Sequence, residues 1–176
     1  GAPASERARA LMTAAFAGCY LAVSSGGRPV VDSDLLFRES SGIAITLDSA
    51  SLSADVELRR GACLIYRKDY QTAEAVLRTT LRAVRTHGLE RLEAHVLGSF
   101  GWIRLRTSRF DDAANWLEQS LAISARLGTR AIDLKLLGNL GWCYTMLGDA
   151  DKALPLLERA QKLAEERGYI EDLELV

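Results

Sequence analysis

The chain has 176 residues, of which 48% are hydrophobic and 26% are charged, and its formal net charge is −1 at pH 7. These values are close to the average of soluble globular proteins and exclude a disordered acidic or basic tail. No apolar run approaches the roughly 18 residues that a membrane span requires, and no secretory signal opens the sequence. We therefore expect a cytoplasmic protein with neither nucleic acid nor a membrane as its partner.

Apolar residues recur at helical spacing along the chain, and no segment shows the alternation typical of a β-strand. In residues 110–127, for example, Phe110, Ala113 and Leu117 belong to one apolar stripe. The pattern predicts helices at residues 5–23, 32–47, 52–67, 70–86, 90–107, 110–127, 130–147 and 150–167, and the start of a ninth near residue 169.

Residues suited to capping stand at the predicted helix ends. Asp69 and Asp149 each precede an apolar run, and Ser108 precedes the helix over 110–127, so all three are expected as N-caps. Glycines favour the left-handed conformation that often ends a helix. The glycines expected in this role are Gly88, Gly128 and Gly168.

The three cysteines, Cys19, Cys63 and Cys143, form no Cys-x-x-Cys pair. An odd number without such spacing argues against a disulfide framework and against a four-thiolate zinc site. Each cysteine lies in an apolar helical stretch, where a free thiol commonly behaves as a small buried hydrophobe. We therefore expect three free, buried cysteines.

The sequence repeats itself at a spacing of 40 residues. The hexapeptide LGSFGW that begins at Leu97 recurs as LGNLGW at Leu137. Three further sets share this spacing and are predicted as structural repeat positions: Gly61, Gly101 and Gly141; Ala73, Ala113 and Ala153; and Leu77, Leu117 and Leu157. The glycine of the first helix is expected to face the alanine of the second, with the leucine filling the space beyond. Each helix pair then leaves an apolar face that only a neighbouring pair can bury, which predicts stacking into a solenoid.

This arrangement of small and apolar positions resembles the tetratricopeptide repeat (TPR). Residues 134–167 match best. Residues 94–127 match well, except that Arg104 stands at the repeat position that Tyr144 occupies 40 residues later. In residues 54–87, Glu57 and Arg60 occupy slots that are usually apolar. The resemblance implies an all-α, right-handed α-solenoid of antiparallel helix pairs. It implies one domain over 1–176, with repeats at 5–47 (degenerate), 54–93, 94–133 and 134–168, and the start of another at 169–176.

The 40-residue period resembles the long-period branch of the family, as in kinesin light chains and bacterial regulatory proteins. In the latter, such arrays precede CHAT protease domains or accompany transcription-factor and signalling domains. The resemblance implies a non-catalytic scaffold that binds a protein or peptide and is a fragment of a larger protein. The alternative is a regulatory or autoinhibitory arm that binds an effector domain of the same chain. Self-association through the C-terminal face is also expected.

The sequence contains no motif that indicates catalysis or metal binding. Phosphate-binding glycine loops, HExxH and GxSxG motifs are all lacking. The two histidines, His87 and His95, are separated by a helix break and have no cysteine or carboxylate partners at ligand spacing. We therefore expect neither an enzyme nor a cofactor or metal.

The resemblance also indicates a concave groove lined by the first helix of each pair. The candidate peptide-binding residues are Tyr66 in the first repeat; His95, Ser99, Trp102 and Arg106 in the second; and Lys135, Asn139, Trp142 and Met146 in the third. The resemblance also places Leu58, Ile65 and Leu105 in this groove. Lys135 and Asn139 lie one turn apart and point the same way, as in part of a carboxylate clamp. Trp102 and Trp142 are either groove anchors or core residues.

Arginines are concentrated in residues 78–109, which hold seven of them against two glutamates. Arg78, Arg82 and Arg85 share one helical face. This band, which includes Arg104, is either a solvated face or a surface for an acidic partner.

Overall fold

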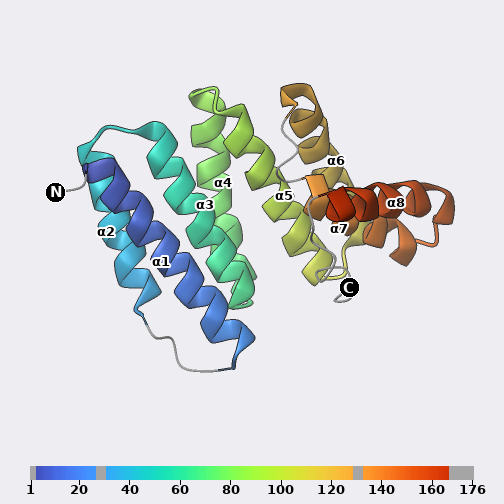
Figure 1. Cartoon of the computed structure of the whole chain (residues 1–176), viewed down its shortest axis with the longest axis horizontal. Coiled ribbons are helices and arrows are strands. Elements are labelled where there is room, and N and C mark those ends of the chain that lie inside the picture. Colours follow the sequence, from blue (N-terminus) through green and yellow to red (C-terminus); the bar gives the residue numbers. More distant parts are fainter. Residues whose placement is uncertain (1–2, 27–30, 129–132, 167–176) are drawn as a thin grey trace. The chain divides into compact units, whose positions relative to one another are not determined.

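The computed structural model describes residues 3–26, 31–128 and 133–166 (Figure 1). These residues form eight α-helices and no β-strand. The helices are α1 (Ala4–Ser24), α2 (Ser33–Thr46), α3 (Ala50–Tyr66), α4 (Tyr70–Thr86), α5 (Glu90–Arg106), α6 (Phe110–Leu127), α7 (Asp133–Met146) and α8 (Ala150–Glu166). The all-α fold class is confirmed, and the eight helices lie where the periodicity placed them. The ninth predicted helix lies outside the described residues.

The chain divides into two compact units, Gly1–Leu92 and Glu93–Val176. In the first unit, α1 packs on α2, α3 packs on α4, and both α1 and α2 contact α3 (Figure 1). Its core contains Met12, Phe37 and Val56, with a second cluster formed by Ala8, Ala44 and Leu52. Whether residues 1–176 behave as a single domain stays a prediction.

In the second unit, α7 packs on both α6 and α8. One core cluster joins three helices, with Leu105 from α5, Leu117 from α6 and Leu140 from α7. The placement of Leu105 in a groove is therefore wrong, because its side chain is buried among apolar neighbours. Leu58 and Ile65 are also buried, so they do not line a groove either.

Each of the last three helix pairs closes on a glycine–leucine contact. A Cβ atom placed on Gly61, Gly101 or Gly141 would lie 2.8, 2.6 and 2.6 Å from a side-chain carbon of Leu77, Leu117 and Leu157, respectively. The glycine thus meets the leucine first. The carbonyl oxygens of Ala113 and Ala153 are next, 3.4 and 3.5 Å away. The alanines Ala73, Ala113 and Ala153 are buried as predicted, as are Leu77 and Leu117, whereas Leu157 stays 38% exposed.

Buried hydroxyl groups add hydrogen bonds between paired helices. Ser40 Oγ donates to the carbonyl oxygen of Ala8 at 2.8 Å, and Ser120 Oγ donates to that of Ala94 at 2.6 Å. Thr80 stands at the position of Ser120 one repeat earlier, but it donates to Val76 of its own helix at 3.0 Å. The hydroxyl at this repeat position therefore links α6 to α5 in the case of Ser120, whereas that of Thr80 bonds only within α4.

The helix caps agree with the sequence except at one position. The side chains of Asp69 and Asp149 accept hydrogen bonds from the amides of Thr72 and Lys152, each at 3.2 Å. Gly88 and Gly128 have left-handed φ values of 62° and 64°. Ser108 does not cap α6. It has a left-handed φ of 57°, and Arg109 stands at the N-cap, where its side chain makes no capping hydrogen bond. Gly168 lies outside the described residues.

The expectation of three free cysteines is wrong for two of them. Cys19 of α1 and Cys63 of α3 form a disulfide, with their Cα atoms 6.0 Å apart. The pairing depends on α1 packing across α3, which the spacing of the cysteines along the chain does not reveal. Cys143 is free and buried as predicted, and burial raises the pKa of its thiol to about 11.

Candidate functional site

An exposed stripe of large and polar side chains runs along α7. Lys135, Asn139, Trp142 and Met146 follow one another at helical spacing, so they share a face. Trp142 is 36% and Met146 51% exposed, Lys135 is exposed and Asn139 is half-buried. Since the other side of α7 supplies core residues such as Leu140, Trp142 lies at the surface of this unit.

A second stripe lies on α5. His95, Ser99 and Trp102 are half-buried and Arg106 is exposed, and Ser99 Oγ donates to the carbonyl oxygen of His95 at 3.0 Å. The two helices approach closely, because a Cβ atom on Gly98 of α5 would lie 3.1 Å from a methyl carbon of Leu136 on α7. The two stripes, on neighbouring helices, contain three basic residues and no carboxylate.

In the first unit, the candidate residue Tyr66 lies in an aromatic cluster. Its ring packs edge-on against Phe16 and Tyr20 of α1, with ring centroids 6.0 and 5.4 Å apart. The guanidinium carbon of Arg59 lies 5.9 Å from the centroid of Phe16, and Arg59 also pairs with Asp55 at 3.4 Å. Burial, followed by the nearby Tyr20, raises the pKa of Tyr66.

Phe16 and Tyr20 were not among the sequence candidates. The degenerate repeat over 5–47 offered no signature from which to assign groove positions in α1. Their spacing of four residues, which places two aromatic rings on one helix face, is the signal that could have indicated them.

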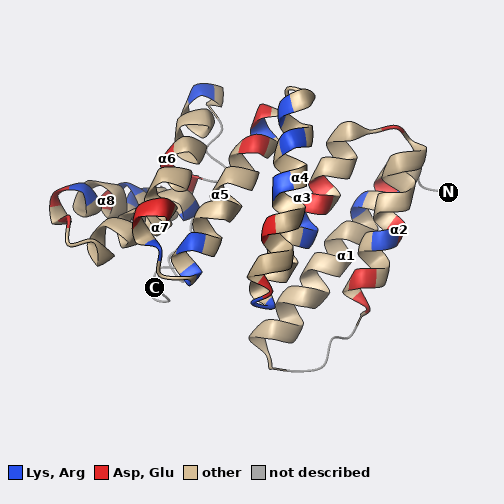
Figure 2. Ribbon diagram, turned by 180° about the vertical axis from the view of Figure 1, so that it is seen from behind, with Lys and Arg blue, Asp and Glu red and all other residues tan. Residues whose placement is uncertain are grey.

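The arginine band does not form one solvated face. Arg104 is only 9% exposed, so its inclusion in that band is wrong; it occupies the slot that Tyr144 fills one repeat later. Arg78 pairs with Glu74 and Arg109 with Asp112. Figure 2 shows basic residues along α4, where Arg78, Arg82 and Arg85 are exposed.

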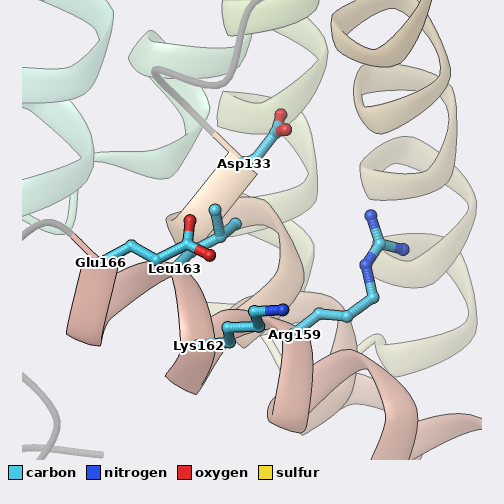
Figure 3. A pocket seen from close by; sticks show the side chains of 5 residues that line it. All are labelled: Asp133, Arg159, Lys162, Leu163 and Glu166. Atoms are coloured by element: carbon cyan, nitrogen blue, oxygen red, sulfur yellow. The ribbon is translucent and has the colours of Figure 1, made fainter.

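A small pocket of about 300 Å³ lies at the C-terminal end of α8 and the first residue of α7 (Figure 3). Its lining combines two cations, two carboxylates and one apolar side chain: Arg159, Lys162, Asp133, Glu166 and Leu163. Ser124 Oγ donates to Asp133 Oδ1 at 2.6 Å. None of the predicted groove residues lines this pocket, and its mixed charges favour no single ligand.

The described residues contain no group of three or more histidine, cysteine, aspartate or glutamate side chains that could hold a metal ion. Within the same ranges, no helix is long and apolar enough to cross a membrane. The two stripes combine exposed aromatic and thioether groups with an amide and basic side chains, a composition suited to contacts with another polypeptide.

The fold and this surface define a class of helical-hairpin repeat proteins. Two models of the tetratricopeptide repeat match the chain, one over residues 52–126 and the other over residues 136–168. The chain belongs to the tetratricopeptide-repeat family. Such repeats generally mediate protein–protein interaction and scaffolding, and they are typically not catalytic. A search of curated proteins found no match to the chain.

Proposed function

We propose that the chain is a non-catalytic interaction module that binds a peptide or helix of a protein partner along α5 and α7. The observation that carries this proposal is the exposure of Trp142 and Met146 on the same face as Lys135 and Asn139. Tryptophan is enriched among the residues that dominate binding energy at protein interfaces. Methionine adapts to partners of varied shape.

The polar members of the stripe suit a polypeptide ligand. The side-chain amide of Asn139 can donate to and accept from a peptide backbone. Lys135, His95 and Arg106 would favour a partner segment with carboxylates, because none of the eight stripe positions on α5 and α7 carries a negative charge. In the first unit, the aromatic cluster around Tyr66 would offer a partner apolar contacts of its own.

Site-specific photocrosslinking tests this proposal. A photoreactive phenylalanine analogue would replace Trp142 in the full chain, and a control would carry it at Gln119, an exposed position on α6. We expect one protein partner to be captured from position 142 and not from position 119. Equal capture at both positions, or none at position 142, would contradict the proposal.

A second candidate function is a regulatory or autoinhibitory arm of a long-period array, attached to a CHAT-type protease or a bacterial transcription or signalling regulator. The supporting observation is the exposed apolar surface of the last described helix pair, where Leu154 is 60% and Leu157 38% exposed. An effector domain of the same polypeptide could cover these residues. Replacing Leu154 by Glu in the full-length protein should then raise effector activity, and unchanged activity would argue against this arrangement.

A further inference from the structure

A furrow of about 500 Å³ lies between α3 and α4 in the first unit. Ala54, Glu57 and Arg60 line it from α3, and Val76, Thr79 and Ala83 line it from α4. Successive residues of a helix are about 100° apart. Glu57 therefore points about 200° away from Arg59, which shares its helix face with Tyr66. The furrow thus lies on the side of α3 opposite the groove positions.

Two of the residues that line the furrow, Glu57 and Arg60, form an ion pair. Arg60 donates to Glu57 Oε2 from Nε at 2.9 Å and from Nη2 at 2.6 Å. Ser41 Oγ of α2 donates to the other carboxylate oxygen at 3.2 Å. Because the carboxylate is held from two helices, the guanidinium of Arg60 has a defined position, yet its side chain remains 37% exposed. A guanidinium plane held in this way can stack on an aromatic ring.

The next helix pair, α5/α6, has aromatic side chains at the positions of Arg60 and Val76. Forty residues on, Arg60 is replaced by Phe100 and Val76 by Trp116. The two rings pack with their centroids 5.0 Å apart and their planes tilted by 31°. An indole on one helix therefore covers an aromatic ring on the other, whereas Val76 leaves that volume open above Arg60.

Basic side chains flank this open volume on α4. Arg82 is exposed and its Nη2 atom lies 3.5 Å from Thr79 Oγ1, at the edge of the furrow. Within the described parts of the chain, Arg82 forms no ion pair with a carboxylate. Arg78, one turn earlier on the same face of α4, pairs with Glu74 of its own helix. Basic residues appear as blue bands along α4 in Figure 2.

We propose that this furrow is a docking site for an acidic amphipathic helix of a partner protein. The helix inserts one aromatic side chain over Arg60, in the volume that Trp116 fills in the next repeat, and turns carboxylates toward Arg82. Helices commonly bind in grooves through apolar anchors one turn apart, and the opposite charges set the orientation. This site is separate from the groove face of α5 and α7, so the two proposals stand or fall independently.

The test uses the full chain and a fluorescent synthetic peptide of about 16 residues, long enough to form a helix. The peptide carries one central tryptophan, with glutamates one turn before and one turn after it. Two control peptides replace the tryptophan by alanine or the glutamates by glutamine. Fluorescence anisotropy would measure the dissociation constant at low and high salt. We expect both control peptides to bind more weakly, and binding of the acidic peptide to weaken with salt.

Five protein variants locate the binding. Val76→Trp introduces the residue of the next repeat and should fill the furrow, weakening binding about tenfold or more. Ala83→Ile, also taken from the next repeat, provides a second filling variant if Val76→Trp does not fold. Arg82→Gln should weaken binding about threefold at low salt and less at high salt. Gln119→Ala, at an exposed position on α6, is the matched control and should bind normally. Trp142→Ala reports whether the peptide binds in the groove instead.

Several results would overturn this proposal. These are no binding at about 1 mM peptide, equal binding by the tryptophan and alanine peptides, or unchanged affinity in the folded furrow-filling variants. Loss of binding in Trp142→Ala would place the peptide in the groove and would also reject the furrow. Success at the furrow would leave the photocrosslinking experiment at position 142 to decide the groove on its own.

Discussion

The helix pairs α3/α4 and α5/α6 share a backbone frame but differ in the side chains that fill it. In both pairs a glycine of the first helix closes on a buried leucine of the second, Gly61 on Leu77 and Gly101 on Leu117. The neighbouring slots differ sharply. The second pair fills them with stacked aromatic rings, whereas the first has an ion pair and an open furrow.

This difference shows that the frame of a repeat and its filling are separable. Close approach of two helices requires a small residue where their backbones come nearest, and that requirement is met in both pairs. The slots around this contact can be apolar or polar as long as polar groups find partners, as Glu57 does. Surfaces with binding potential arise where the filling departs from the apolar pattern.

The largest expected effect on the free energy of unfolding comes from substituting alanine at equivalent repeat positions of the two pairs, Arg60 and Phe100. Phe100 is buried against Trp116, so Phe100→Ala should lower the free energy of unfolding by about 3–5 kcal/mol. Arg60→Ala removes a partly exposed side chain and should change it by less than about 1 kcal/mol. Chemical denaturation followed by circular dichroism would measure both. Similar losses in the two variants would contradict the separation of frame and filling.

The disulfide between α1 and α3 is expected to stabilise the unit that contains the pair α3/α4 and not the unit that contains α5/α6. Closing a loop between residues separated by 44 positions should contribute about 2–4 kcal/mol by restricting the unfolded chain. Reduction with dithiothreitol should therefore speed hydrogen exchange in α1–α4 and leave α5–α8 unchanged. The double variant Cys19→Ser/Cys63→Ser serves as control, because it should not respond to the reductant. Exchange in the wild-type chain that does not respond to reduction would refute this role.

The glycine contacts allow the frame itself to be tested. Gly101→Val should destabilise the chain by about 3 kcal/mol, because its new atoms meet the fully buried Leu117. Gly141→Val meets Leu157, which is partly exposed and free to move aside, so about 1 kcal/mol is expected. Gly138→Ala is the control: a Cβ there meets no atom within 4 Å, and stability should hold or rise slightly. Equal losses at Gly101 and Gly141 would show that exposure of the leucine does not matter.

A smaller effect distinguishes the hydroxyl groups of the two pairs. Ser120→Ala removes a buried hydrogen bond between helices and should cost about 1–2 kcal/mol, since the carbonyl of Ala94 loses a partner. Thr80→Val removes a hydroxyl that bonds only within its own helix and should cost less than about 0.5 kcal/mol. Thermal unfolding of both variants would measure the difference. The comparison fails if the two losses are the same.

The sequence was sufficient to predict the frame because the frame depends on residue spacing. Helix positions and the glycines at turns such as Gly88 follow from periodicity and backbone preference. The repeat register follows from the 40-residue spacing of the glycine, alanine and leucine sets. Positions that depend only on spacing within one helix pair were therefore predicted well.

Contacts between helices from different pairs could not be predicted in the same way. The bond between Cys19 and Cys63 requires α1 to cross α3, and the aromatic cluster at Tyr66 depends on the same packing. The burial of Arg104 could not be read from its charge, since a basic residue in a repeat slot is ordinarily expected at the surface. The stripe on α7 was predicted by residue, but its role as a binding surface rests on the proposal above.

The last contrast concerns a tyrosine whose surroundings have no counterpart one repeat earlier. The Tyr144 hydroxyl donates to Glu118 Oε1, and Lys152 Nζ lies 4.9 Å from the centroid of its ring. Forty positions before Glu118 and Tyr144, the chain has two arginines, Arg78 and Arg104. The hydrogen bond to Glu118 is the main cause that raises the pKa of Tyr144 to about 12.

An unfolded tyrosine has a pKa of about 10, so the folded chain favours the protonated phenol. This contribution to stability is complete below pH 10 and is lost as the pH rises from about 10 to about 12. Glu118→Gln removes the carboxylate and should move the pKa of Tyr144 back toward 10, as measured by nuclear magnetic resonance of the phenolic carbon. Glu158→Gln, the same position one repeat later, is exposed and should leave that pKa near 12. A pKa that stays near 12 in Glu118→Gln would mean that burial, and not the carboxylate, protects the phenol.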